Sequence, residues 1–170
     1  GVDTAVHCQD VMADGFPRMK LDFESAIDKL YQGKNFGQKT GKGFYSYEMD
    51  KRGKPKKLAN DEIKGIIQSV QETTRDFSND EIVERMMIPM CIETALCLDD
   101  RIVGSPIEAA LGLVLGLGFP PFRGGALRHT DSLGLSTFCD RADVYSELGE
   151  LYKPTSSMRE MGRANEIYYQ

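Results

Sequence analysis

Largely apolar positions in the second half of the chain recur at the spacing of an amphipathic helix. After Ser78 they stand at Ile82, Val83, Met86, Met87, Met90, Thr94 and Leu98. Ser78-Asn79-Asp80-Glu81 has the form of a capping box, so a long helix is predicted to begin there, and Pro89 is predicted to bend it toward the core. Because the methionines fall on or near the apolar stripe, we interpret them as core residues rather than as an adaptable ligand surface.

Three further elements are predicted after this helix. Ser105-Pro106-Ile107-Glu108 is a second capping box with proline at the first helical position, and its helix is expected to reach about Leu115. Residues 116–125 hold two prolines between glycines, which predicts a rigid turn. Helices are expected over residues 125–133 and 136–148, the second capped by Ser136 and each ended by a glycine.

The first half has weaker patterns. Four elements are predicted there: a helix over residues 3–12, a helix over residues 23–31, a short extended segment over residues 44–48 and a weak helix over residues 61–70. Asp3 or Thr4 is expected to cap the first helix, and Gly33 is expected to end the second. The chain is therefore predicted to be mostly α.

Two motifs recur in the same order, which indicates an internal duplication. The run 36–45, Phe-Gly-Gln-Lys-Thr-Gly-Lys-Gly-Phe-Tyr, has a weaker echo in 161–169, and Gly1-Val2-Asp3-Thr4 matches Gly134-Leu135-Ser136-Thr137. The predicted organisation is residues 1–50 as the remainder of a first helical repeat, 51–77 as a linker and 78–170 as a second helical repeat. The first repeat is then truncated at its N-terminus, and Gly1 is expected to be a cut end.

Composition and charge narrow the class of protein. Of the 170 residues, 41% are hydrophobic, which can supply an ordinary core, and the net charge of −5 argues against a nucleic-acid surface. The four cysteines show no Cys-x-x-Cys spacing and the two histidines stand far apart, so neither a zinc site nor a disulfide framework is indicated. No apolar run approaches a membrane span, and a reducing, cytoplasmic compartment is expected.

Three motifs together resemble one known family. The run 36–45, then Arg85-Met86-Met87-Ile88-Pro89 and residues 116–125, stand in the order and at the spacing of the carboxy-terminal region of the 3-hydroxyacyl-CoA dehydrogenases. The chain looks most similar to the multifunctional alpha subunits of the bacterial fatty-acid β-oxidation complex. The resemblance covers essentially the whole chain and implies a duplicated 3-hydroxyacyl-CoA dehydrogenase C-terminal-like helical domain.

The resemblance also implies an activity and partners. The intact enzyme is expected to oxidise 3-hydroxyacyl-CoA with NAD, beside upstream dinucleotide-binding and hydratase domains and a thiolase subunit. In that family the nucleotide fold and the catalytic His-Glu pair precede this region, so no catalytic residue is assigned here and the isolated chain is expected to be inactive. The alternative is a helical interaction module that docks a thiolase subunit or itself and has no ligand of its own.

Three residues are candidates for a role. The backbone N–H groups among the glycines around Lys39 can form an anion-binding concavity, and the resemblance implies that Lys39 contacts NAD; a solvated surface lysine is the alternative. Leu115 stands where some relatives have a tyrosine associated with substrate, so an apolar substrate contact or a plain core role is expected. Glu84 replaces the family's active-site asparagine, and a carboxylate can only accept hydrogen bonds, so the second repeat is expected to be structural.

One basic segment remains, from Lys51 to Lys57. Its glycine and proline break regular structure, which favours a solvated linker. Contact with an acidic partner or with a CoA phosphate is the other interpretation, because a cationic segment attracts anions over about a Debye length.

Overall fold

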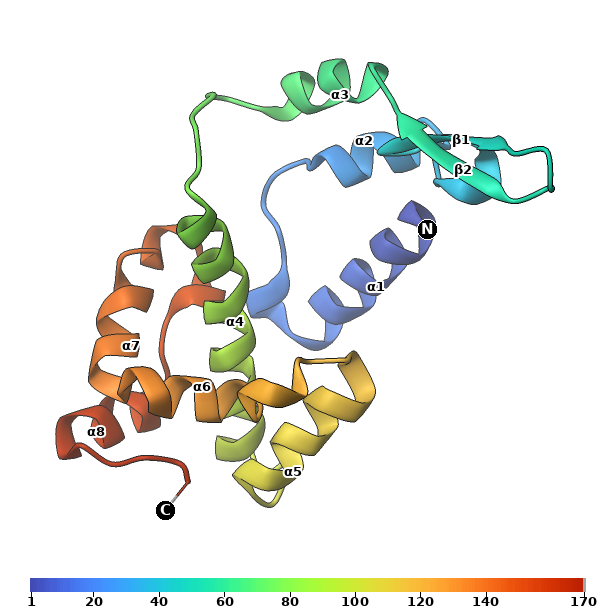
Figure 1. The fold of residues 1–170 in the computed structure, drawn as a ribbon. Coiled ribbons are helices and arrows are strands. Elements are labelled where there is room, and N and C mark those ends of the chain that lie inside the picture. Colours follow the sequence, from blue (N-terminus) through green and yellow to red (C-terminus); the bar gives the residue numbers. More distant parts are fainter. Residues whose placement is uncertain (170) are drawn as a thin grey trace. The chain divides into compact units, whose positions relative to one another are not determined.

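The computed structural model describes residues 1–169, which form eight α-helices and one two-stranded antiparallel sheet (Figure 1). The prediction of a mostly α fold is confirmed. The chain divides into two compact units, Gly1–Asp76 and the part from Phe77 onward. The first unit holds α1 (Val2–Gly15), α2 (Ala26–Gln32), β1 (Tyr45–Met49), β2 (Pro55–Ala59) and α3 (Glu62–Val70). The second unit holds α4 (Asn79–Asp99), α5 (Pro106–Leu111), α6 (Ala126–Leu133), α7 (Leu135–Asp143) and α8 (Ser156–Ala164).

The core of the second unit is built on α4. Ile88, Cys91, Ile92 and Ala95 are buried along one side of this helix, at helical spacing. They belong to one cluster with buried residues of the later helices, namely Ala109, Ala126, Leu127, Leu135, Phe138, Cys139, Ala142 and Met158. All of these side chains lie within the second unit, which therefore has its own hydrophobic core.

The buried side of α4 differs from the predicted stripe. Ile82, Val83 and Met86 are exposed, with 70% of Met86 accessible, so the assignment of Met86 to the core is wrong; Met87 and Met90 are partly buried. Apolar residues occur nearly all round this helix, so their spacing does not select one face. The helices that pack against α4, chiefly α6, make that selection.

Pro89 lies inside α4 without ending the helix. Proline has no N–H, so the carbonyl of Arg85, four residues earlier, loses its helical donor. The hydroxyl of Tyr152 donates a hydrogen bond of 2.9 Å to that carbonyl. A side chain from the far end of the unit thus replaces the bond that the proline removes.

The helix caps predicted at Ser78 and Ser105 and the turn predicted over residues 116–125 are confirmed, whereas the predicted cap at Ser136 is wrong because α7 begins at Leu135 without a side-chain cap and ends at Asp143. Ser78 accepts from the N–H of Glu81 at 3.1 Å, and Ser105 accepts from the N–H of Glu108 at 3.2 Å. Gly118, Gly124 and Gly125 all have positive φ, so the turn needs the glycines that the sequence places there. Within the turn Phe119 is buried, which anchors it to the unit.

In the first unit, α1 begins at Val2 after Gly1, so the predicted cap at Asp3 or Thr4 is wrong. The side chain of Asp3 pairs with Lys39 instead. Helix α2 is shorter than predicted because Ser25 and Asp28 form a reciprocal capping box, which leaves Phe23 outside the helix. Gly33 ends α2, as predicted.

The basic segment is more regular than a solvated linker. Residues 55–59 form β2, which pairs with β1 so that Lys57 lies opposite Tyr47 and Lys56 opposite Glu48. The range 51–77 thus holds a strand and a helix, α3.

The two units share a helix pair, which supports the duplication. Helices α1 and α2 pack together in the first unit, and α7 and α8 pack together in the second; α1 follows Gly1 and α7 follows Gly134. The second helix of each pair ends in the same turn. Lys34 and Asn165 have left-handed φ values of 56° and 55°. The N–H groups of Asn35 and Glu166, one residue further on, bond back to the carbonyls of Leu30 and Met161 at 2.8 and 2.9 Å.

These turns correct the predicted alignment of 36–45 with 161–169. Since Lys34 corresponds to Asn165, Phe36 corresponds to Ile167 and not to Met161. Gly37 lies in a loop with φ 98°, whereas Gly162 lies inside α8, where a Cβ would come within 2.9 Å of the Ser136 nitrogen. One glycine serves a turn and the other a close helix crossing, so their likeness in sequence has no common structural cause.

Candidate functional site

Lys39 lies on a tight loop of the first unit. It belongs to the 3-10 turn Gln38–Thr40, between Gly37 and Gly41, whose positive φ values of 98° and 74° few other residues adopt. The Thr40 hydroxyl accepts a bond of 2.9 Å from the N–H of Phe36, which closes the loop on itself. The glycines of this run therefore fix where Lys39 leaves the backbone.

The loop forms one wall of an open groove of about 680 Å³. The groove is lined by Gly1, Val2, Phe36, Gly37, Gln38, Lys39, Phe44, Tyr47 and Met49. Its aromatic and aliphatic walls suit a planar or aliphatic group, and Lys39 is the cation among the lining residues. A ligand with an apolar body and a negative charge fits this combination.

Lys39 is engaged by an acidic neighbour. Its ammonium group forms a salt bridge with the carboxylate of Asp3, and about half of the lysine side chain remains exposed. The hydrogen bond from Lys39 is the main cause that holds the pKa of Asp3 below its ordinary value. The second carboxylate oxygen of Asp3 is buried without a hydrogen-bond partner. An anionic ligand must therefore compete with Asp3 for Lys39.

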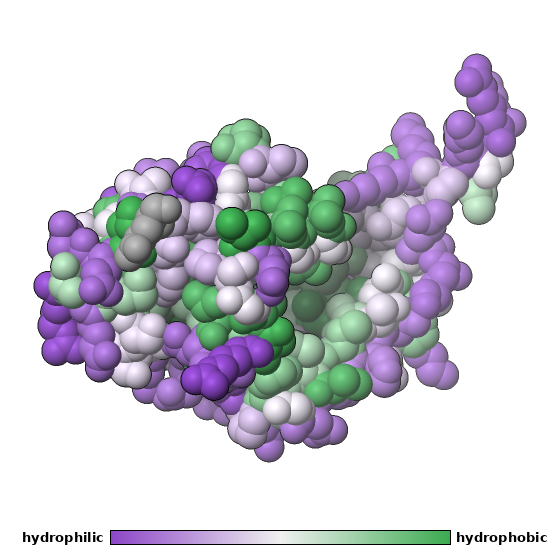
Figure 2. All heavy atoms as spheres, turned by 90° about the horizontal axis from the view of Figure 1, so that it is seen from below, coloured by the Kyte–Doolittle hydropathy of each residue, from purple (hydrophilic) through white to green (hydrophobic). Residues whose placement is uncertain are grey.

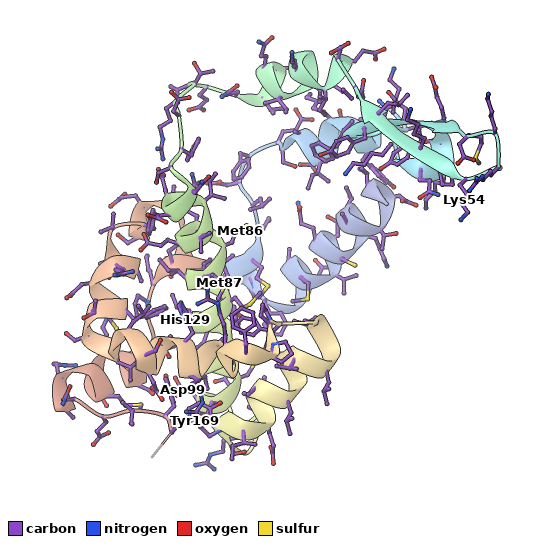
Figure 3. The ribbon with its side chains drawn as sticks, viewed as in Figure 1. Lys54, Met86, Met87, Asp99, His129 and Tyr169 are labelled. Carbon is purple, nitrogen blue, oxygen red and sulfur yellow. The ribbon has the colours of Figure 1, made fainter. Side chains whose placement is uncertain are left out.

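The second unit holds a smaller cavity, of about 370 Å³, between α4, α6 and α7. It is lined by Asp80, Val83, Glu84, Met87, Ile88, His129, Leu133, Phe138 and Arg141. Figure 3 places Met87 on α4 and His129 on α6, the two helices that face each other here. The sequence did not indicate this cavity, since its residues come from helices that are far apart along the chain.

Glu84 is fully engaged within this cavity. One carboxylate oxygen accepts from the Arg141 guanidinium at 3.2 Å, and the other accepts from the Tyr145 hydroxyl at 2.8 Å. The bond to Glu84 is the main cause that raises the pKa of Tyr145. These bonds connect α4 to α7 and to the turn after it, which supports the predicted structural role of the second repeat.

His129 is half-buried beside the same cavity. Burial is the main cause that lowers the pKa of His129, and the nearby charges of Arg123 and Arg141 lower it further. A catalytic histidine of a dehydrogenase is made basic by a carboxylate, whereas these neighbours favour the neutral ring. The geometry therefore gives His129 no catalytic role.

Leu115 lies in a π-helical turn, Gly112–Gly116, that continues α5, and 81% of it is exposed. A plain core role for Leu115 is therefore wrong. It belongs to a set of exposed apolar side chains on this part of the second unit, Ile107, Leu111, Leu115, Leu117 and Phe122. Figure 2 shows hydrophobic side chains gathered on the face that includes α5. Leu115 lines none of the cavities described above.

Two features are absent from residues 1–169. No group of three or more histidine, cysteine, aspartate or glutamate side chains in this range is placed to hold a metal ion. Within the same range, no helix combines the length and the apolar character that crossing a membrane requires.

Comparison with known proteins gives close relatives over the whole chain. The chain is 52% identical over 170 residues to the fatty acid oxidation complex subunit alpha of Pseudomonas syringae pv. syringae (strain B728a), and 50% identical to that of Ectopseudomonas oleovorans. Each match covers 99% of this chain and 24% of the relative. The chain thus spans about a quarter of the length of these relatives. No family model matches the chain.

Among solved structures, the chain is similar to the dehydrogenase part of multifunctional enzyme 1 from C. elegans. The TM-score is 0.59 at 23% identity, over 89% of this chain and 35% of that one. The fold is accordingly the helical fold found within a multifunctional dehydrogenase. The chain is, more particularly, homologous to a part of the bacterial fatty acid oxidation complex alpha subunits, so the resemblance predicted from the sequence is confirmed.

Proposed function

We propose that this chain is the substrate-side and assembly part of an NAD-dependent 3-hydroxyacyl-CoA dehydrogenase within a multifunctional enzyme of fatty-acid β-oxidation. One observation carries the proposal, namely the identity of about half of all residues, along the full chain, with fatty acid oxidation complex alpha subunits. The proposed partners are upstream dinucleotide-binding and hydratase domains and a thiolase subunit, and the proposed compartment is the cytoplasm.

The proposed division of labour follows from what hydride transfer needs. NAD accepts the hydride, and it is held by a parallel sheet with a glycine-rich turn, while a base removes the hydroxyl proton. Residues 1–169 contain one antiparallel pair of strands and no parallel sheet. In the proposal, this chain therefore forms one side of the active-site cleft of the intact enzyme. Lys39, on its glycine-bounded loop, supplies a positive charge to the NAD phosphates.

The isolated chain is expected to be inactive. Purified residues 1–170, supplied with NAD and 3-hydroxybutyryl-CoA, should produce no NADH by absorbance, while a full-length alpha subunit that contains this region should turn over. Robust NADH formation by the isolated chain would contradict the proposed division. A full-length protein without dehydrogenase activity would contradict the proposed function itself.

Lys39→Ala in the full-length protein is expected to raise KM for NAD about tenfold, because a charge-assisted bond to phosphate is lost. Lys42→Ala is the matched control, since Lys42 lies in the same glycine-rich run and pairs with Glu62. Steady-state kinetics with NAD varied would measure both. An equal KM for NAD in the wild type and in Lys39→Ala would rule out this role of Lys39.

Leu115 is proposed to give an apolar contact to the acyl chain in the intact enzyme, where it is free to meet another surface. The rival function is an interaction module that docks a thiolase subunit or itself. The exposed apolar residues around Leu115 support that rival, because a contiguous apolar surface often marks an interface. Leu115→Asp separates the two: loss of thiolase co-purification with unchanged KM for long-chain substrate favours docking, and the reverse result favours substrate contact.

A further inference from the structure

The β-hairpin of the first unit ends in a turn whose shape is held by its own polar groups. Both N–H groups of Arg52 and Lys54 donate to the carboxylate of Asp50, each at 2.8 Å. The N–H of Asp50 donates to the carbonyl of Lys54 at 2.8 Å, and Gly53 takes the left-handed φ of 72° that closes the turn. Pro55 then fixes the first residue of β2. The side chains on this turn are thus displayed from an ordered backbone.

The turn presents cations that the chain itself does not neutralise. Lys51, Arg52, Lys54 and Lys56 are exposed and make no ion pair within residues 1–169. Figure 3 shows Lys54 at the end of the hairpin. Other lysines of this unit are paired, for example Lys39 with Asp3 and Lys42 with Glu62. Lys20 and Lys64 are also unpaired within the described residues but stand singly along the chain, so the turn is the part of the unit where unpaired cations are most closely spaced.

Acidic groups near the turn offset this charge only in part. Asp50 is occupied by backbone N–H groups, and Glu48 lies across the ladder from Lys56 on the same face without an ion pair to it. Lys57 is placed over the ring of Tyr45, 3.5 Å from its centroid, so it leaves the cluster. Lys51, Arg52, Lys54 and Lys56 outnumber the two carboxylates of Glu48 and Asp50, so the turn keeps an excess of positive charge.

The net charge of the chain favours a small anionic ligand over an extended polyanion. With a net charge of −5 overall, an extended polyanion laid on the chain would also meet acidic surface. A compact group with several phosphate charges meets only the turn, because screening confines the interaction to about 8 Å at physiological ionic strength. Ordered backbone lowers the entropic cost of gathering cations around such a group.

We propose that this hairpin turn binds the phosphate groups of the coenzyme A carrier, at its adenosine 3′-phosphate end, with Lys51, Arg52 and Lys54 as the contacting cations. The choice of coenzyme A as the source of the phosphates rests on the proposed function. The turn binds the coenzyme A end of the acyl thioester, and the acyl chain binds at another site. It is separate from Lys39, whose proposed ligand is NAD.

Titration calorimetry on residues 1–170 tests this with CoA, dephospho-CoA, pantetheine and NAD. CoA is expected to bind more tightly than dephospho-CoA, pantetheine is expected to show no binding, and CoA affinity should fall as salt rises. Lys51→Gln/Lys54→Gln should weaken CoA binding about five- to tenfold, because two solvent-exposed charge contacts are lost together. The same double variant should leave the affinity for NAD unchanged. Lys20→Gln/Lys64→Gln is the charge-matched control, since both residues are exposed in the same unit and make no ion pair within residues 1–169.

Equal affinity for CoA and pantetheine, or an equal loss in both double variants, would overturn the proposal. So would binding to phosphatidylglycerol vesicles without binding to CoA. If the hairpin variant fails to fold by circular dichroism, the ratio of CoA to dephospho-CoA affinity in the wild type decides. Turnover of the full-length wild type tests the proposed function independently. If the hairpin double variant binds CoA as tightly as the wild type while the full-length enzyme turns over, the hairpin proposal alone is wrong.

Discussion

At the scale of single residues, the structure shows how a local defect is repaired from a distance. Pro89 leaves the Arg85 carbonyl without its helical donor, and Tyr152 supplies the missing hydrogen bond from a position 67 residues away. The sequence predicted the defect, since proline in a helix interior always removes a donor. It held no local sign of the repair, because the donor reaches the carbonyl only after the unit has folded.

Tyr152→Phe is expected to destabilise the second unit by about 1 kcal/mol, because the Arg85 carbonyl loses its partner. In a Pro89→Ala background the new backbone N–H can bond to the same carbonyl, so the same substitution should cost markedly less. Urea denaturation of the four proteins in this double-mutant cycle would measure the coupling. Tyr45→Phe is the control, since the Tyr45 hydroxyl makes no hydrogen bond within residues 1–169. Independent, additive effects at positions 89 and 152 would refute the repair.

The Asp3 and Lys39 pair is a second residue-scale case. The sequence indicated Asp3 as a helix cap and Lys39 as an anion ligand, each from its immediate neighbours. In the structure they bind each other, which no pattern within a few residues can show. The candidate ligand site therefore includes a carboxylate that the sequence did not place there.

At the scale of elements, the close crossing of α7 and α8 explains Gly162. A Cβ at this position would lie 2.9 Å from the Ser136 nitrogen and 3.2 Å from the Leu135 carbonyl carbon, both of them backbone atoms that cannot move easily. The crossing thus depends on the missing side chain. Gly65 in α3 offers a contrast, because nothing lies within 4 Å of its added Cβ.

Gly162→Ala is expected to destabilise the protein by about 1 to 3 kcal/mol, since the clash exceeds the roughly 1 kcal/mol that alanine gains in helix propensity. Gly65→Ala should instead stabilise α3 by about 0.5 to 1 kcal/mol, because only the propensity term applies. Both changes can be followed by urea denaturation monitored by circular dichroism. A Gly162→Ala protein as stable as the wild type would show that the two helices can separate without cost.

Helix α4 marks the limit of element-scale prediction. Its start after Ser78 was predicted from a capping-box sequence, and a long helix was expected, as the structure shows. Its buried face was not predicted, because apolar residues surround the helix and periodicity cannot rank them. Met86 is exposed while Ile88 and Ile92 are buried, an outcome that depends on where α6 packs.

At the scale of the whole molecule, burial is unevenly divided between the units. Among residues 1–169, the buried hydrophobic side chains of the first unit are Val2 and Leu30, and all the others belong to the second unit. Since hydrophobic burial is the main favourable term in folding, the second unit should be much the more stable.

Cysteine labelling should report how rarely the core of the second unit opens, with an exposed cysteine as the reference. Cys8 is exposed on α1, whereas Cys91 is fully buried in the core of the second unit, where burial raises its thiol pKa to about 12. With a maleimide at neutral pH, Cys8 should react in the native protein, and Cys91 should react only as the second unit unfolds. Mass spectrometry of peptides sampled over time would give both rates. Equal rates for the two cysteines would mean that the core opens freely.

The sequence alone determined the helical class of the fold, the caps at Ser78 and Ser105 and the glycine turn around Pro120, because each depends on residues within a few positions of one another, and it determined the family resemblance through the order and spacing of its motifs. Tertiary structure decided which face of α4 is buried, which donor serves Arg85, how the repeats correspond and what Lys39 binds. Those outcomes depend on groups brought together by packing, from positions tens of residues apart. Periodicity and propensity carry no information about such encounters.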